Sequence, residues 1–255
     1  MMRMAGKSTT DEDMDLALAA ELQAVLLPTE IPEAGPHHSF SARNRMCHSV
    51  GGDFYDFIVL NDQQVAVTIG DVVGHGVRAS LVMAQIMGFL RSRPADLSRP
   101  VRLVESLNEM LIALGDKLGA LMPCSLFYMV LDLPSGVCFY VNAGHPKPIL
   151  FNQESRQSRL VPGNTVLLGV EPFRPDEMCH TFVSGERLVM YTDGIVDCHD
   201  RDGVLFGHER LRDIVVETCH LEPSDLADHV FATVEQHRNS RCRCDDETIV
   251  VVDRL

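Results

Sequence analysis

The sequence predicts an α+β domain, with β-sheet in the middle and helices outside it. Three observations indicate this fold class. Short runs rich in Val, Ile, Phe and Tyr are bounded by turn residues, which is typical of strands. Longer stretches between them carry apolar residues at helical spacing. The turn sequence Pro134–Ser135–Gly136 separates two of the short runs and predicts a hairpin, which favours antiparallel pairing.

The N-terminal region is predicted to be a flexible start over residues 1–10, followed by a linker or switch helix over residues 11–28. Leu18, Leu22 and further apolar residues fall near helical spacing, and Pro28 ends the pattern. A helix at this edge of the fold packs either on its own domain or against a partner, and the sequence leaves both open.

The remainder, residues 30–255, is predicted to form one domain because it contains no internal repeat, low-complexity tract or convincing linker. The expected strands lie at 54–60, 63–71, 124–133, 136–144, 187–197 and 247–255. The expected helices lie at 77–93, 100–118, 209–219 and 223–239.

The composition is that of a globular protein with an acidic surplus. Of the 255 residues, 45% are apolar and 23% are charged, which argues against a disordered or fibrous chain. The 36 acidic and 22 basic side chains give a formal net charge of −14. Nucleic acids and anionic membrane surfaces require a basic footprint, so neither is an expected partner. The surplus is either a solvated surface or includes carboxylates that converge on metal cations.

The sequence points to a cytoplasmic protein. No stretch approaches the roughly 18 apolar residues of a transmembrane helix, and residues 1–15 lack the apolar core of a signal peptide. The eight cysteines are scattered and form no CxxC pair, so a structural zinc site is not expected. Reduced thiols explain them, although Cys242 and Cys244 leave a redox or metal role open.

Several aspartates stand where strands are expected to begin or end. Asp53, Asp71 and Asp193 each adjoin an apolar run and a glycine. Asp245 and Asp246 directly precede the last expected strand. Ionised carboxylates near one another repel, and burying one without a partner is costly.

Divalent cations would offset this repulsion, since four carboxylates carry −4 and two dications carry +4. Ligation by oxygen alone favours hard cations such as Mg²⁺ or Mn²⁺ over Zn²⁺. The neighbouring glycines let the backbone approach, so that a peptide carbonyl can join the ligands. Each aspartate taken singly is more simply explained as a turn residue or helix cap, but their shared placement favours a metal site.

Five motifs follow one another along the chain: GGDFYD (51–56), GDVVGHG (70–76), NAGHP (142–146), YTDGI (191–195) and DDETIVVV (245–252). In this order they resemble the sporulation stage II protein E family. That family is the bacterial branch of the metal-dependent type 2C (PPM) serine/threonine phosphatases and includes the sigma-B regulator phosphatases. The resemblance covers about residues 15–255, including ELQAVLLP (21–28) and LFGHERL (205–211). It implies a central β-sandwich of two antiparallel sheets flanked by helices.

The resemblance also implies a centre of two Mn²⁺ or Mg²⁺ ions. Asp71 would bridge them, with the carbonyl of Val72 on one ion. Asp193 and Asp245 would complete the shell of the second ion. Asp53 would lie at the first ion, directly or through its waters. Asp245 is preferred to the aspartate that follows it because it occupies the family position before the final strand.

A water bridging the two ions would be the nucleophile, which makes Asp53 and Asp71 the catalytic residues. It would attack phosphorus in line with the serine or threonine oxygen, so no phosphoenzyme is expected. Further candidates for supporting the ions or contacting the substrate are Asp56, Gly74, His75, Asp246 and Arg45.

Two departures from the wider superfamily limit this transfer. Eukaryotic relatives carry a phosphate-binding arginine where this chain has His48, so Arg43 or Arg45 could substitute for it, although a surface role explains both equally well. Those relatives also place a histidine two residues after the bridging aspartate. His75 lies four residues after it and is therefore expected to be a turn or supporting residue. His145 is expected to be structural.

Family members usually act on a phosphoserine or phosphothreonine of a STAS-domain anti-sigma-factor antagonist, and a sensor or receiver module commonly precedes them. Because only about 30 residues come before the fold, the chain is expected to be a fragment of a longer signalling protein or to be controlled by a partner in trans. The helix at 11–26 resembles the segment that couples dimerisation to activity, so a homodimer through it is predicted. A shift of this helix would reposition Asp53 or the turn after Asp71.

Two rival functions are weighed against this one. A catalytically weak regulatory module would bind its phosphorylated partner without hydrolysing it, but the presence of all four metal-type aspartates argues against that. GGDFY also resembles the GGDEF signature of diguanylate cyclases. There, however, Phe54–Tyr55 would replace the required acidic residue, and the other four motifs have no place.

Overall fold

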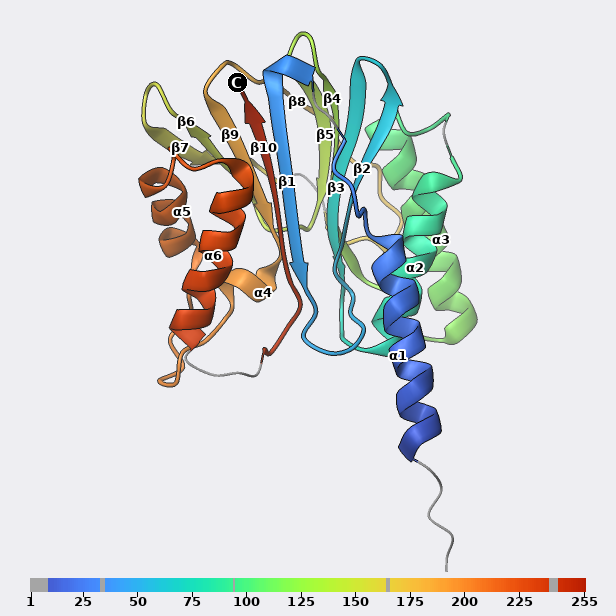
Figure 1. The fold of residues 1–255 in the computed structure, drawn as a ribbon. Helices are drawn as coiled ribbons and strands as arrows, with labels where there is room; N and C mark the ends of the chain where they lie inside the picture. The colour runs from blue at the N-terminus through green and yellow to red at the C-terminus, as the bar shows by residue number, and fades with distance from the viewer. Residues whose placement is uncertain (1–8, 33–34, 94, 164–165, 239–242) are drawn as a thin grey trace, which may run out of the picture.

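The computed structural model describes residues 9–32, 35–93, 95–163, 166–238 and 243–255. Two five-stranded antiparallel sheets pack face to face, and helices cover both outer faces (Figure 1). This arrangement confirms the predicted α+β fold with a central sandwich. Most of the predicted flexible start over residues 1–10 lies outside the described residues, and Thr9 and Thr10 already belong to a helix.

The two sheets differ in which parts of the chain they use. One contains the first and last strands, in the order β1 (His38–Arg45), β10 (Glu247–Arg254), β9 (Glu186–Tyr191), β6 (Ile149–Asn152) and β7 (Gln157–Leu160). The other follows chain order, with β2 (Phe54–Asn61), β3 (Gln64–Val72), β4 (Cys124–Asp132), β5 (Val137–Ala143) and β8 (Met178–Thr181).

The helices form two outer layers (Figure 1). One sheet is covered by α2 (Val77–Arg91) and α3 (Pro100–Leu118), and the other by α4 (Asp193–Val196), α5 (His208–Glu217) and α6 (Pro223–Arg238). α1 (Thr9–Leu26) lies against α2 and extends past the end of the sandwich. A short 3₁₀ turn, Gly35–His37, leads into β1.

Side-chain alternation along the strands divides the interior into three cores. In β10, Val250 belongs to the core between the sheets, whereas Ile249 belongs to the core beneath α5 and α6. In β4, Met129 lies between the sheets and Tyr128 lies beneath α2 and α3. Each central strand is therefore apolar on both faces, which explains the nearly continuous apolar runs in the sequence.

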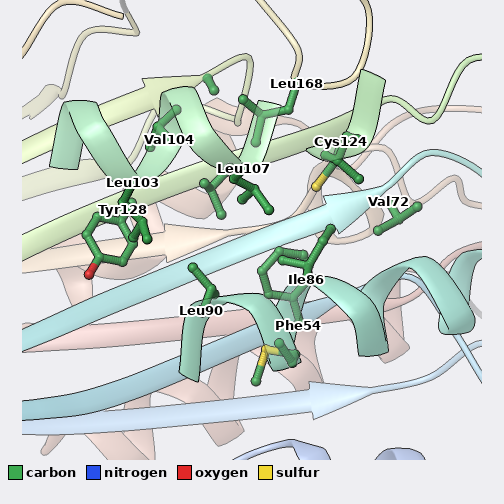
Figure 2. Close-up of a cluster of buried hydrophobic side chains, with 14 of the residues drawn as sticks. Phe54, Val72, Ile86, Leu90, Leu103, Val104, Leu107, Cys124, Tyr128 and Leu168 are labelled. Atoms are coloured by element: carbon green, nitrogen blue, oxygen red, sulfur yellow. The ribbon is translucent and has the colours of Figure 1, made fainter. Parts of the chain in front are cut away.

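The core beneath α2 and α3 also holds the end of β3 in place (Figure 2). Leu90 points inward from α2, and Leu103 and Leu107 point inward from α3. Burying a side chain of this size stabilises the fold by about 1.5–3 kcal/mol. Val72, the last residue of β3, belongs to the same core, so packing fixes the strand end that carries Asp71.

Most predicted elements begin and end within two residues of their predicted bounds. They are the four helices predicted after residue 76 and the strands predicted at 54–60, 63–71, 124–133, 136–144 and 247–255. Sequence analysis missed β1, β6, β7 and β8. β1 is interrupted by serines and arginines, and each of the others has only four residues, too few for a clear period of two.

The predicted strand at 187–197 is wrong in its second half. The chain leaves the sheet after Tyr191 and turns into α4, where the Asp197 N–H donates a hydrogen bond to the Asp193 carbonyl at 2.7 Å. Within the described residues, no helix combines the length and the apolar character needed to cross a membrane.

Candidate metal centre

The antiparallel sheet order brings the predicted aspartates to one end of the sandwich. Asp53 directly precedes β2 and Asp71 lies at the end of β3, and the pairing of these two strands sets the aspartates beside each other. In the other sheet, Asp193 follows β9 and Asp245 precedes β10, which pairs with β9. Figure 1 places α4 and the loop between β1 and β2 at this same end.

Asp53 is the most enclosed of these four side chains, with 1% of its surface exposed. Its Oδ2 atom accepts hydrogen bonds from Thr192 Oγ1 at 2.7 Å and from Thr248 Oγ1 at 2.5 Å. Thr248 lies in β10 and Thr192 directly follows β9, both strands of the other sheet, so the contact between the sheets fixes the orientation of this carboxylate. Sequence analysis missed both, although the motifs YTDGI and DDETIVVV contain them.

The carboxyl groups lie close enough together to raise one another's pKa. Burial raises the pKa of Asp71 to about 7, and the charges of Asp193 and Asp245 add to the rise, against a hydrogen bond with Asp53. Burial and the charge of Asp71 hold the pKa of Asp53 well above its usual range, despite the two threonine hydrogen bonds. Burial also raises the pKa of Asp193 and of Asp245. A divalent cation would reverse these shifts, because it favours the ionised form of each group.

Two glycines let the backbone pass closely around the carboxylates. A Cβ on Gly52 would lie 2.6 Å from the carbonyl oxygen of Val72 and 3.2 Å from Asp71 Oδ1. A Cβ on Gly194 would lie 1.9 Å from the carbonyl oxygen of Asp246. Both positions therefore require glycine, and the predicted carbonyl ligand lies directly against the loop that leads into β2.

Asp245 and Asp246 differ in their burial and in their contacts. Asp246 is buried, and its carboxylate accepts hydrogen bonds from the backbone N–H of Cys47 at 2.7 Å and of Gly52 at 2.8 Å. Asp245 is exposed, and its charge acts on Asp71 and Asp193. Asp246 thus holds the loop before β2. Asp245 as the metal ligand of the two stays a prediction.

The donor set at this end of the sandwich fits a hard cation. Among the described residues, no three Asp, Glu, His or Cys side chains are arranged around one point as metal ligands. Oxygen donors alone suit Mg²⁺ or Mn²⁺. The groups that could hold such ions are Asp53, Asp71, the Val72 carbonyl, Asp193 and Asp245.

A cleft of about 600 Å³ opens beside Asp71 and Asp193. Its lining combines the cation of Lys147 with several apolar side chains, so it can receive a peptide segment next to the carboxylates. Asp197 lines this cleft and also a second hollow of about 130 Å³ that contains Asp245. Sequence analysis missed Asp197, whose signal is its position one helical turn after Asp193.

The two arginines considered as phosphate ligands are engaged with α6. Arg45 pairs with Glu235 at 3.1 Å, and its guanidinium lies 4.5 Å from the ring centre of Phe231. Arg43 pairs with Asp228 at 2.8 Å. They stand two residues apart on β1 and so point to the same side, towards this helix. The structure therefore gives both arginines a contact with α6 in place of the predicted phosphate contact.

Asp56 likewise serves the fold instead of the carboxylate cluster. It is buried on β2 and pairs with Arg91 of α2 at 2.9 Å. Another nitrogen of Arg91 donates a hydrogen bond to the Leu26 carbonyl, at the end of α1, at 2.8 Å. The predicted supporting residue thus links β2, α2 and α1.

Gly74 and His75 lie on the turn between β3 and α2. Gly74 has a φ of +105°, which favours glycine. The ring of His75 is exposed and lies 5.2 Å from that of His48. Its charge opposes the rise in the pKa of Asp245. This placement fits the supporting role expected for His75.

His145 is buried and contacts the protein's own polar groups. Its Nδ1 hydrogen-bonds with Ser125 Oγ at 2.9 Å, and its backbone N–H donates to Asn142 Oδ1 at 2.9 Å. Burial lowers the pKa of His145 to about 3, so the ring is neutral near pH 7. These contacts fit the structural role expected for it.

The fold, with acidic side chains gathered at one end, defines a class of protein. The SiaA-PP2C domain of Pseudomonas aeruginosa superposes with a TM-score of 0.83 at 17% identity, over 98% of this chain and 100% of that one. The catalytic domain of the serine threonine protein phosphatase PstP, in complex with 2 manganese ions, superposes with a TM-score of 0.63 at 13% identity, over 85% of this chain and 98% of that one. Identities this low establish the fold alone. The chain therefore has the PP2C-type (PPM) phosphatase fold.

Within this class, the chain belongs to the Stage II sporulation protein E (SpoIIE) family, whose profile matches residues 61–255. Protein IcfG of Synechocystis is 27% identical over 94% of this chain. Phosphoserine phosphatase RsbP of Bacillus subtilis is 22% identical over 97% of this chain. The matches span 42% of the length of IcfG and 59% of the length of RsbP.

Proposed function

We propose that this chain is a metal-dependent protein serine/threonine phosphatase, which hydrolyses phosphoserine or phosphothreonine. The observation that carries the proposal is the gathering of Asp53, Asp71, Asp193 and Asp245 at one end of a PP2C-type sandwich, where burial, together with neighbouring carboxylate charges, raises their pKa values. The relative RsbP, a phosphoserine phosphatase, supports the same reaction.

The proposed centre holds two divalent cations, Mn²⁺ or Mg²⁺. When bound, they supply an acidified water and positive charge for the phosphoryl oxygens. Asp71 would bridge the two positions, with the Val72 carbonyl beside it. Asp53 is held in one orientation by the two threonine hydroxyls, and Asp193 and Asp245 act from the other sheet. The manganese complex of PstP supports the number of ions.

The substrate is proposed to enter the cleft beside Asp71 and Asp193. A phosphorylated residue at its inner end would face the carboxylate cluster, while the residues that flank it lie along the apolar lining. Lys147 provides positive charge for the phosphate or for an acidic neighbour in the peptide. The geometry thus suits a phosphorylated segment of a protein.

The partner class follows from the family. We propose a phosphorylated STAS-domain anti-sigma-factor antagonist as the substrate, in a cytoplasmic partner-switching pathway. Residues 11–28 would act as a linker from an upstream sensor or receiver module, and residues 30–255 as the phosphatase domain. The chain spans only part of its curated relatives, which is compatible with such a module.

A homodimer through α1 is also part of the proposal. Four apolar side chains of this helix are exposed by half or more of their surface and recur at spacings of four, four and three residues. That spacing forms one stripe along the helix, which suits a second copy of the same helix. The stripe consists of Met14, Leu18, Leu22 and Val25.

Phosphate release from phosphorylated STAS-domain proteins encoded by neighbouring genes tests the proposed activity. We expect release that requires Mn²⁺ or Mg²⁺ and stops in EDTA. A regulatory module of the rival kind would instead bind the phosphoprotein without releasing phosphate. Stable binding of the phosphoprotein without phosphate release at any metal concentration would therefore favour the regulatory module over the phosphatase.

A further inference from the structure

A groove of about 310 Å³ opens where the turn after β3 meets the loop from α3 to β4. Both segments lie at the end of the sandwich that carries the carboxylates (Figure 1), and the backbone N–H of Val73 donates a hydrogen bond to the Pro123 carbonyl at 3.0 Å. Val73 lines this groove and also the cleft beside Asp71 and Asp193. The groove therefore adjoins the cleft that the phosphorylated residue is proposed to enter.

The lining of this groove combines apolar surface with positive charge. Val73 and Leu121 expose 55% and 60% of their surface beside it. Arg78 adds a guanidinium, and none of the described residues that line the groove is an Asp or Glu. Since the whole chain has 36 acidic and 22 basic side chains, this lining is opposite in charge to the protein as a whole. It suits a partner that presents both an apolar and an anionic side chain.

Arg78 has no partner of opposite charge among the described residues. Its side chain is exposed, and its guanidinium contacts Met122 Sδ at 3.8 Å, beside the groove that both residues line. Arg78 is also the second residue of α2, where the positive end of the helix dipole gives a cation no stabilisation. Neither an ion pair nor the helix therefore accounts for this charge, which is available to a bound anion.

We propose that this groove is a docking site for the phosphorylated protein, separate from the cleft that takes the phosphorylated residue itself. An acidic side chain of the substrate pairs with Arg78, and an apolar one packs against Leu121 and Val73. The inference rests on the proposed phosphatase function and narrows its substrates to proteins that carry acidic and apolar residues beside the phosphorylated one. Because these contacts are made away from the reacting phosphate, they strengthen substrate binding without altering the hydrolytic step.

Synthetic phosphoserine peptides of equal length test the groove, with p-nitrophenyl phosphate as a substrate too small to reach it. One pair of peptides carries two Glu and one Leu, either before or after the phosphoserine. A second pair has Lys in place of Glu, and a reference peptide has Gln and Gly at these positions. We expect wild type to hydrolyse the better Glu peptide with a kcat/KM about tenfold above that of the reference, through a lower KM.

Arg78→Glu should reverse this order. The Lys peptide should then exceed the Glu peptide, because the charge at the groove has changed sign. Hydrolysis of p-nitrophenyl phosphate and its dependence on Mn²⁺ should stay as in wild type. Arg78→Gln, the milder change, should abolish the preference for Glu without creating one for Lys. An unchanged order of the peptides in both variants would overturn the inference, and so would an equal loss on p-nitrophenyl phosphate.

Two further variants separate the groove from general effects. Leu121→Asp should raise the KM for the Glu peptide about tenfold and leave the hydrolysis of p-nitrophenyl phosphate unchanged. Arg102→Glu is the matched control, because Arg102 is also exposed in the first turn of a helix but lies at the start of α3, the end away from the groove. It should keep the wild-type order of the peptides. If it alters the order as much as Arg78→Glu does, net charge determines the preference and the inference is wrong.

Binding without hydrolysis separates failure of the groove from failure of the proposed function. Fluorescence anisotropy in EDTA measures the affinity of fluorescein-labelled peptides of the same sequences with unphosphorylated serine. If the Glu peptide binds more tightly to wild type and the order reverses in Arg78→Glu, the groove is confirmed, and absent phosphate release then contradicts the proposed function alone. If wild type hydrolyses and binds all peptides alike, the function stands and the inference fails. A change of oligomeric state in Arg78→Glu with an unchanged peptide order would assign the groove to a second copy of the chain, which also contradicts the inference.

Discussion

At the scale of single residues, the hydroxyls of Thr192 and Thr248 decide how Asp53 is presented. Thr248 also accepts a hydrogen bond from Asn44 Nδ2 at 2.8 Å, which leaves its own proton for Asp53 Oδ2. Both hydroxyl protons go to the same oxygen of Asp53, so the two threonines fix how this carboxylate is turned. In the proposed centre, this orientation would set how Asp53 meets the ions.

The first prediction therefore concerns Thr248→Val, which keeps the shape of the side chain and removes the hydroxyl. We expect Mn²⁺ affinity or phosphate release to fall by about 10–100-fold, because partners that orient metal ligands contribute to this extent. Thr248→Ser, which retains the hydroxyl, should stay close to wild type. Titration of activity with Mn²⁺ measures the effect, and similar values for the two variants would contradict this role of the hydroxyl.

Gly52 gives a second test at this scale. In Gly52→Ala the new Cβ would collide with the Val72 carbonyl, so either the loop or the proposed ligand must move. We expect at least a tenfold loss of Mn²⁺ affinity, about 1.4 kcal/mol. Gly88→Ala on α2 is the control, since its Cβ meets nothing within 4 Å. That change should stabilise the helix by about 0.5–1 kcal/mol, without an effect on metal binding.

The raised pKa of Asp71 predicts how stability depends on pH. In EDTA, the folded chain keeps a proton on Asp71 up to about pH 7, whereas the unfolded chain releases it near the ordinary aspartate pKa of 3.8. The contribution of Asp71 to the free energy of unfolding therefore falls as pH rises from about 4 to 7. The buried His38 and His145, whose pKa values are lowered, act in the opposite direction.

The difference between wild type and Asp71→Asn isolates this contribution. Urea unfolding in EDTA should show the stability of wild type falling relative to Asp71→Asn across this window. Saturating Mn²⁺ should remove the fall, because the ion holds the carboxylate ionised. A difference that is constant with pH would show that Asp71 ionises normally.

Residue-level reasoning from the sequence found the aspartates but not their supports. Strand ends and glycines mark Asp53, Asp71 and Asp193 in the sequence. The threonine hydroxyls reach Asp53 only because the two sheets meet face to face, and no spacing along the chain shows this. The position of Arg45 shortly before Asp53 in the sequence predicts that it lies near the site. In the structure, however, its side chain points from β1 towards α6.

At the scale of secondary-structure elements, α1 has two distinct faces. One side chain, Gln23, reaches the loop before β2, while the exposed stripe of Met14, Leu18, Leu22 and Val25 points elsewhere. A second copy bound to the stripe would therefore move or fix the helix that holds Gly51. This arrangement would connect assembly with the metal centre.

Replacing Leu18 and Leu22 by Asp tests the stripe. These side chains are 56% and 62% exposed, so the fold of the monomer should not depend on them. We expect a dimeric wild type and a monomeric double variant by size-exclusion chromatography with light scattering. A double variant that remains as dimeric as wild type would exclude α1 as the interface.

The elements themselves were predicted unevenly. Long apolar runs with clear bounds, such as β3 and β4, were found because their length and composition exceed what a turn or loop shows. The four-residue strands β6, β7 and β8 were not predicted, since only their pairing with other strands defines them. The residues of α4 were predicted as strand because four residues that directly follow a strand are too few to show a helical period.

At the scale of the whole molecule, topology assembles the site from parts that lie far apart in the sequence. Asp53 and Thr248 are separated by 195 positions, yet they share a hydrogen bond because β2 and β10 begin at the same end of the two sheets. The acidic side chains behind the net charge of −14 are likewise distributed over different parts of the molecule. Several acidic groups gather at this end, where cations would neutralise them, and others, such as Asp228 of α6 and Asp253 of β10, pair with arginines of β1 and β9 or lie at the surface.

The most direct test of the metal-dependent mechanism is the hydrolysis of p-nitrophenyl phosphate as a function of Mn²⁺, measured together with the number of ions bound, in wild type and Asp193→Asn. We predict two ions per wild-type chain, no hydrolysis in EDTA, and a loss on the order of 10³-fold in Asp193→Asn, since a metal ion contributes several kcal/mol to transition-state stabilisation. Hydrolysis that persists in EDTA, or equal rates in the two proteins, would contradict the account.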